Sequence, residues 1–142
     1  MTEEMMRIIT VEEHYISNEV NRGFLEDASK EMTQEQKVKA KFISDYIQKD
    51  GKITDLGRRR IEFMDRAGID IQFLSYGNNS PMSLSGKDAI RLSREANDEL
   101  FHACKENPDR LYGLATLPAG EPEAAAEEME RTAKELQFRG AL

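Results

Sequence analysis

Three ionisable residues, Glu12, Glu13 and His14, follow a short β-branched run at residues 7–11. The run predicts a buried strand, and the triplet falls at its carboxyl end. Because alternate residues of a strand share a face, Glu12 and His14 point to one side and Glu13 to the other. A carboxylate oxygen and an imidazole nitrogen on one face form half of a mixed site that zinc or manganese accepts. The alternative is a solvated strand end, because Glu-x-His spacing also arises by chance.

Other side chains with useful chemistry are fewer. Ser75, Tyr76 and Asn78 follow a second predicted strand and are candidate substrate contacts, although loop formation alone also explains such residues there. Tyr15 either lines a pocket for an aromatic acid or packs in the core with a satisfied hydroxyl. His102 falls at the flank of a predicted helix and is interpreted as a surface residue. No catalytic residue can be assigned from these patterns.

The elements that must position these residues alternate between strands and helices. A long polar segment at 15–54 follows the first strand and contains a predicted helix at 34–48, begun by Thr33. Further helices are predicted from 56 to 67, from Ser85 and from Pro122, and further strands at 69–74, 111–117 and 138–142. This order indicates an α/β fold with a parallel sheet. Four such strands are half of a (β/α)₈ TIM barrel, so we expect residues 1–142 to form a single partial domain.

Apolar spacing predicts which faces of the helices are buried. The helix from Ser85 is expected to have a capping box with Asp88. Its predicted buried stripe comprises Ala89, Leu92, Ala96, Leu100 and Ala103. The predicted apolar face of the last helix comprises Ala125, Met129, Ala133 and Leu136.

Composition excludes several classes of partner. The formal net charge of -7 disfavours nucleic acid and anionic membranes, and the arginines at 58–60 are interpreted as a solvated helix face. No stretch approaches the roughly 20 apolar residues that span a bilayer. The single cysteine, Cys104, is interpreted as core packing and favours a reducing compartment. The amino terminus lacks the basic and apolar regions of a signal peptide, so we expect a cytoplasmic protein.

Several motifs together resemble one enzyme family. Residues 11–15, Val-Glu-Glu-His-Tyr, are similar to the signature of the aromatic-acid decarboxylase branch of the amidohydrolase-2 family. Residues 64–70, 74–75 and 96–100 and the run Asn-Pro-Asp-Arg-Leu-Tyr-Gly-Leu-Ala-Thr-Leu-Pro at 107–118 resemble the same family. The resemblance covers most of the chain apart from the segment at 17–55. These are mostly scaffold motifs, so they indicate the fold more specifically than the substrate.

The resemblance implies a metal-dependent decarboxylase acting on a phenolic or related carboxylic acid. It assigns Glu12 and His14 as ligands of a divalent metal, zinc or manganese, with a further histidine and an aspartate from later strands. Residues 1–142 supply neither, so we expect this chain alone to be an incomplete catalyst. A metal-dependent hydrolase of the same family is the alternative. A non-catalytic truncated half-barrel, stabilised by self-association or by a partner, is an alternative of another class, and a homo-oligomer is expected.

Overall fold

The computed structural model describes residues 6–28, 30 and 32–142. Three parallel strands form one sheet in the order β1-β2-β3. The strands are β1 (Ile9–Tyr15), β2 (Ile71–Tyr76) and β3 (Leu111–Gly113). The helices are α1 (Asn18–Ala28), α2 (Gln34–Asp50), α3 (Arg58–Ala67), α4 (Gly86–Glu106) and α5 (Pro122–Lys134), with a 3₁₀ turn at Pro81–Ser83.

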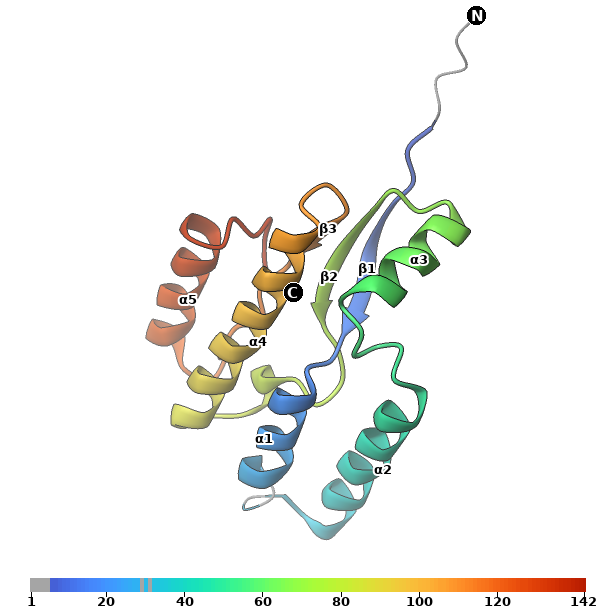
Figure 1. Ribbon diagram of the computed structural model, residues 1–142. Coiled ribbons are helices and arrows are strands. Elements are labelled where there is room, and N and C mark those ends of the chain that lie inside the picture. Colours follow the sequence, from blue (N-terminus) through green and yellow to red (C-terminus); the bar gives the residue numbers. More distant parts are fainter. Residues whose placement is uncertain (1–5, 29, 31) are drawn as a thin grey trace, which may run out of the picture.

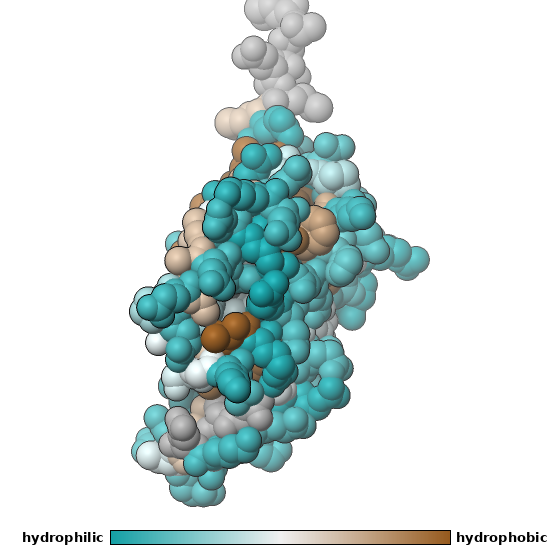
Figure 2. Space-filling view, turned by 90° about the vertical axis from the view of Figure 1, so that its left-hand side faces the viewer, coloured by the Kyte–Doolittle hydropathy of each residue, from teal (hydrophilic) through white to brown (hydrophobic). Residues whose placement is uncertain are grey.

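The helices fall into two groups around the sheet (Figure 1). Helices α3, α4 and α5 run alongside the strands, as the crossover helices of a parallel sheet must. Helices α1 and α2 lie beyond the carboxyl ends of β1 and β2, and Asn21 of α1 donates a hydrogen bond to Ser44 of α2. The outer surface on the α5 side of the molecule is mainly hydrophilic (Figure 2). In the described part of the chain, no helix is long and apolar enough to cross a membrane.

The core lies between the sheet and α4. All five positions of the predicted α4 stripe are buried, and Leu92 and Leu100 have no exposed surface. They pack with Met64 of α3, Leu74 of β2 and Leu111 of β3 in one hydrophobic cluster. Regular 3.6-residue spacing therefore identified this buried face correctly.

Local signals also set several helix ends as expected. Thr33 caps α2, and its side chain and that of Gln36 form a reciprocal capping box. Gly51 ends α2 and Gly68 ends α3, both in the left-handed conformation that glycine adopts without steric cost. The predicted capping box of α4 is wrong, because Ser85 makes no side-chain cap there. Instead, the Glu121 carboxylate accepts a hydrogen bond from the Gly86 amide at 2.6 Å.

Other boundaries and faces differ from the sequence predictions. Helix α1 was missed inside the segment at 15–54, because its apolar residues are few. The predicted apolar face of α5 is wrong in part, since Met129 is 39% exposed and Ala133 is exposed. The buried positions on α5 are instead Glu128 and Thr132, which are polar and follow no hydrophobic period.

The predicted fourth strand is present only as an isolated parallel bridge between Ala115 and Ala141. Its hydrogen bonds nevertheless continue the parallel pairing beyond β3. The Arg139 amide donates to the Gly113 carbonyl at 3.0 Å, and the Ala115 amide donates to the Gly140 carbonyl at 2.8 Å.

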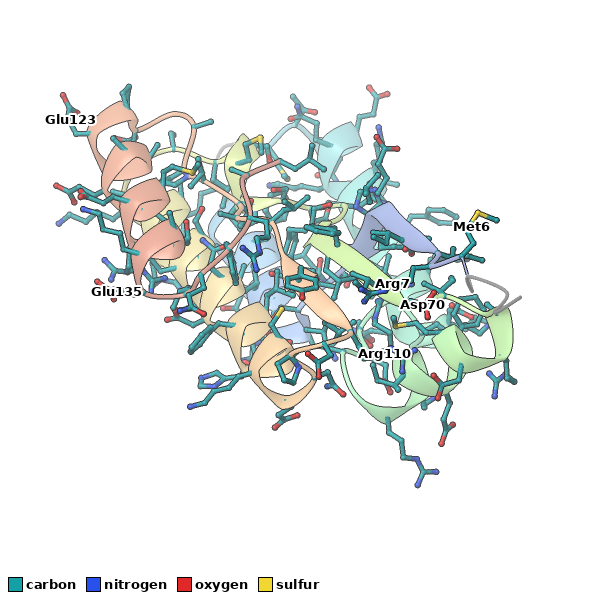
Figure 3. All side chains as sticks on the ribbon, turned by 90° about the horizontal axis from the view of Figure 1, so that it is seen from above. Met6, Arg7, Asp70, Arg110, Glu123 and Glu135 are labelled. Atoms are coloured by element: carbon teal, nitrogen blue, oxygen red, sulfur yellow. The ribbon has the colours of Figure 1, made fainter. Side chains whose placement is uncertain are left out.

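Two charged residues tie together the amino-terminal ends of the strands. Arg110, just before β3, donates to the Asp70 carbonyl at 2.8 Å and to the Asp65 carboxylate at 2.8 Å. The Asp70 carboxylate accepts a hydrogen bond from the Ile8 amide, just before β1, at 2.7 Å. Figure 3 labels Asp70 and Arg110 at this edge. The candidate functional residues lie at the opposite end of the sheet, toward the carboxyl ends of the strands.

Candidate metal site at the carboxyl edge of the sheet

The Glu12–His14 triplet lies inside β1, toward its carboxyl end, and the strand continues to Tyr15. The register with β2 shifts between Thr10 and Glu13, which marks a β-bulge or irregularity at that point. Bulges re-aim side chains and often lie beside active sites. Beyond the irregularity His14 pairs with Ser75 across the two strands.

His14 precedes Tyr15, whose hydroxyl binds the Ala96 carbonyl of α4, so strand alternation directs the His14 ring to the side of the sheet away from α4. Its Nδ1 atom lies 3.0 Å from the Oγ atom of Ser75, which is 1% exposed. Glu12 lies two residues earlier, within the irregular stretch between Thr10 and Glu13, where regular strand alternation does not set the direction of a side chain. Both Glu12 and His14 are exposed. A groove of about 600 Å³ is lined by all three residues of the triplet and by α3 residues that include Arg60 and Phe63, so α3 forms one of its walls. The structure thus pairs the imidazole of His14 with a buried hydroxyl, and Glu12 lies two residues away on the same strand.

Arg60 holds the main chain of this segment from the helix side. Its guanidinium donates to the His14 carbonyl at 3.0 Å, to the Gln72 side chain at 3.2 Å and to the Asp55 carbonyl at 2.9 Å. Burial lowers the pKa of Arg60, and the nearby carboxylates of Glu13 and Asp55 act in the opposite direction. The interpretation of this arginine as part of a solvated face is wrong. The sequence carried a signal for this position, because Arg60 precedes Met64 by four residues. It therefore lies on the same side of α3 as that buried residue.

The two candidate tyrosines belong to the core. Tyr15 is 1% exposed, and its hydroxyl donates to the Ala96 carbonyl of α4 at 2.7 Å. Tyr76 is 8% exposed, and its ring meets that of Tyr15 edge to face at 5.2 Å. Burial is the main cause that raises the pKa of both phenols. Both rings therefore lie on the helix side of the sheet, away from His14. For Tyr15 this agrees with the second of its two predicted roles, packing in the core with a satisfied hydroxyl.

The loop after β2 forms part of the rim around His14. Asn78 is exposed in this loop. The adjacent Asn79 donates to the Asn21 side chain of α1 at 2.9 Å, and its φ of 54° lies in the left-handed region. The Ser80 hydroxyl lies 3.3 Å from that of Thr116, just beyond β3. The rim thus joins α1, the β2 loop and the end of β3.

A buried polar cluster supports this rim from behind, and sequence reasoning missed it. Asn97 of α4 accepts from the Thr116 amide at 2.9 Å and donates to the Thr116 carbonyl at 3.0 Å. The Asn97 side-chain amide also donates to the Glu128 carboxylate of α5 at 2.8 Å. Arg131 binds both oxygens of Glu128 and also the Asp98 carboxylate, which raises the pKa of Arg131 further above its ordinary value. The signal for this cluster in the sequence was the family motif at 96–100, which contains Asn97 and Asp98 among its polar residues.

The donor set fits part of a metal site. Oxygen and imidazole nitrogen suit zinc or manganese, and the bond between His14 and Ser75 resembles the outer-shell bonds that orient ligating histidines. Within the residues that the structure describes, no group of three or more His, Cys, Asp or Glu side chains could hold a metal ion. His102 is exposed on α4, as expected of a surface residue. Glu12 and His14 therefore provide two donors of a site that needs more.

Comparison with known proteins identifies the family. The sequence model described as amidohydrolase matches residues 47–142. The chain belongs to the amidohydrolase family. The γ-resorcylate decarboxylase of a Polaromonas species is 34% identical to this amidohydrolase-family chain over an alignment of 140 residues, and the match covers 94% of this chain and 37% of that protein. The corresponding decarboxylase of Rhodococcus jostii is 38% identical over 92 residues, covering 64% of this chain and 28% of its own.

Solved structures agree with this assignment. A 5-carboxyvanillate decarboxylase of Novosphingobium aromaticivorans, crystallised with manganese and 4-hydroxy-3-methoxy-5-nitrobenzoic acid, has a TM-score of 0.80 and 30% identity. The match covers 98% of this chain and 42% of that one. The 2,6-dihydroxybenzoate decarboxylase of Rhizobium has a TM-score of 0.73 and 29% identity, covering 96% of this chain and 38% of that one.

These comparisons confirm the predicted fold. The three parallel strands and their crossover helices are part of a TIM barrel of the amidohydrolase type. The chain spans about a third of the length of the curated relatives it matches.

Proposed function

We propose that this chain supplies the first two metal ligands, Glu12 and His14, of a divalent-metal-dependent decarboxylase of phenolic carboxylic acids. One observation carries the proposal: both residues lie within β1, toward its carboxyl end, and the His14 Nδ1 atom is 3.0 Å from Ser75 Oγ. Active sites of TIM barrels form at the carboxyl ends of the strands. The relatives named as decarboxylases of hydroxylated benzoic acids support the reaction and the substrate class.

Each residue has a distinct part in this proposal. In the tautomer whose Nδ1–H donates to Ser75, His14 presents the Nε2 lone pair to a metal. Glu12 supplies a negative oxygen ligand from the same strand, and manganese or zinc accepts that pair. A bound divalent metal would supply Lewis acidity, which stabilises negative charge on a bound carboxylate and phenol.

The surrounding residues orient the pair and shape the rim. Ser75 fixes the His14 ring, and Arg60 fixes the His14 carbonyl. Asn78 is exposed on the rim loop, where a substrate carboxylate or hydroxyl can reach its amide. For Tyr15 and Tyr76 we propose an indirect role, since their buried rings support β1 and β2 from the helix side.

The remaining features of the proposal concern the whole protein. We propose that residues 1–142 are part of one barrel domain, whose other strands supply the missing ligands. The single cysteine is consistent with a cytoplasmic location. The decarboxylase reaction is preferred to hydrolysis because the curated relatives are named as decarboxylases.

Manganese binding tests the ligand assignment. Titration of the protein as encoded, with the barrel strands that are proposed to supply the other ligands, is expected to show one Mn²⁺ site by the loss of the free-ion electron paramagnetic resonance signal. Glu12→Gln and His14→Gln should each weaken binding about tenfold or more. His102→Gln is the matched control, because it removes the other histidine of the chain from an exposed position on α4. Equal binding by the His14→Gln protein and the wild type would refute the assignment.

Carbon dioxide release tests the reaction. The protein as encoded, loaded with Mn²⁺, is incubated with 2,6-dihydroxybenzoate carrying a labelled carboxyl carbon. Labelled carbon dioxide is expected from the wild type and the His102→Gln control, and its loss is expected in the His14→Gln variant. Metal binding without release from this or other hydroxybenzoates would reject the decarboxylase. Absence of both would favour the non-catalytic half-barrel.

A further inference from the structure

Helix α2 carries an exposed apolar stripe that the proposed metal site does not use. Val38 is 62% exposed, Phe42 71% and Tyr46 66%. They recur every four residues, so they form one ridge on a helix of 17 residues. Glu35 and Lys49 extend the same ridge by three residues at either end, and both are exposed. A large aromatic residue exposed in this way marks an interaction surface when it belongs to a continuous patch.

The ridge points away from the rest of the molecule. The buried residues of α2 are Ala40, Ser44 and Ile47, which occupy the opposite side of the helix. Ala40 packs with Phe24 of α1, and Ser44 accepts a hydrogen bond from Asn21 at 3.0 Å. The helix is therefore fixed by its inner side, and its outer ridge is preformed for a partner.

The order of residues along the ridge is symmetric about Phe42. Glu35, Val38, Phe42, Tyr46 and Lys49 are spaced by three, four, four and three residues, the same in both directions. An antiparallel copy of α2 centred on Phe42 would place Val38 opposite Tyr46 and Glu35 opposite Lys49. Apolar residues then face apolar residues, and each acidic end faces a basic end. A two-fold interface requires this self-complementarity.

We propose that α2 is a self-association surface, in which two copies of the chain pack their α2 ridges antiparallel about Phe42. Glu35, Phe42 and Lys49 also recur every seven residues, which is the repeat of the seam in a left-handed helix pair. Each copy contributes two aromatic side chains that bury up to about 150–250 Å² each. This is less than the roughly 1,200 Å² of a stable interface, so the dimer is concentration-dependent.

Sedimentation velocity over a concentration series of the full chain tests the proposal. The wild type is expected to shift from monomer to twice that mass as its concentration rises. Phe42→Glu should weaken dimerisation about tenfold or more, because two carboxylates would then meet on the two-fold axis. Met129→Glu on α5 is the matched control, since it also places a charge on an exposed apolar position. Far-UV circular dichroism verifies that each variant remains folded.

Charge reversal distinguishes a second copy from any other occupant. Glu35→Lys places two lysines opposite each other at both ends of the ridge and should weaken the dimer several-fold. Adding Lys49→Glu to the Glu35→Lys variant should restore dimerisation. Adding Lys37→Glu instead, at a position off the ridge, should have little effect. A wild type that stays monomeric, or a Glu35→Lys, Lys49→Glu double variant that is not restored, overturns the proposal. So does a Phe42→Glu variant that unfolds more easily with no change in mass, because the ridge is then covered within one chain.

Discussion

Arg60 provides a sharp test of how the candidate site is held. Its guanidinium makes three hydrogen bonds, to the Asp55 carbonyl, the Gln72 side chain and the His14 carbonyl. Gln72 is 1% exposed, so removal of Arg60 leaves its side-chain oxygen buried without this donor. Hydrogen bonds to a charged donor contribute about 1.5–3 kcal/mol each, and part of that is recovered when water reaches a half-exposed group.

We therefore expect Arg60→Met to lower the free energy of unfolding by about 2–4 kcal/mol. Methionine keeps much of the apolar stem, so the change isolates the loss of the guanidinium. Arg60→Lys keeps the charge without the planar fork and should recover only part of the loss. Arg59→Met on the next, exposed position of α3 is the control and should change the free energy by about 0.5 kcal/mol or less.

Urea unfolding followed by far-UV circular dichroism measures these differences, because the chain has no tryptophan. If Arg60 also positions His14, the Arg60→Met variant should bind Mn²⁺ more weakly even in the absence of denaturant. A loss of stability equal to that of Arg59→Met would refute the reasoning, since it would mean that the three bonds contribute nothing beyond a solvated arginine.

Three further outcomes are expected. Asn97→Asp turns the donor that faces the Thr116 carbonyl into a buried carboxylate, and thermal unfolding should report a loss of about 3 kcal/mol or more. Gly113→Ala should destabilise the fold by about 1–3 kcal/mol in urea, because the new methyl group would lie 2.5 Å from the Phe138 ring. Burial raises the pKa of Cys104 to about 12 from 9.0, so the native state retains a proton that the unfolded chain releases. The Cys104 thiol should therefore leave the free energy of unfolding unchanged below pH 9 and lower it by about 1.4 kcal/mol per pH unit as the pH rises toward 12. In a pH series of unfolding experiments, Cys104→Ala should abolish this contribution.

Much of the architecture was predictable because it depends on neighbouring residues. The α4 stripe was read from spacing, since apolar residues at three- and four-residue intervals share one face of a helix. The ends of α2 and α3 followed from a capping threonine and from glycines that take a left-handed conformation. Strand alternation also predicts that Glu12 and His14 share a face, which stays a prediction because the register with β2 shifts between Thr10 and Glu13.

The parts that were not predicted depend on partners distant in sequence. Glu128 is buried in α5 because Asn97 and Arg131 surround it with donors, and a carboxylate has no apolar period to detect. Helix α1 is short of apolar residues and is recognisable only through its packing on α2 and α4. A polar residue is buried when its hydrogen bonds are satisfied, and only the folded chain determines that.

The sequence by itself determined the alternation of strands and helices, the family and the residue types of the proposed metal-ligand pair, because periodicity, capping and motifs are properties of the chain. The tertiary structure decided how those residues are used. It placed Ser75 against His14, turned Tyr15 and Tyr76 into the core and directed Arg60 to the main chain of β1. Residues 61 and 46 positions apart meet in these contacts. Such pairs form only when the parallel strands and their crossover helix have packed, since no local rule brings them together.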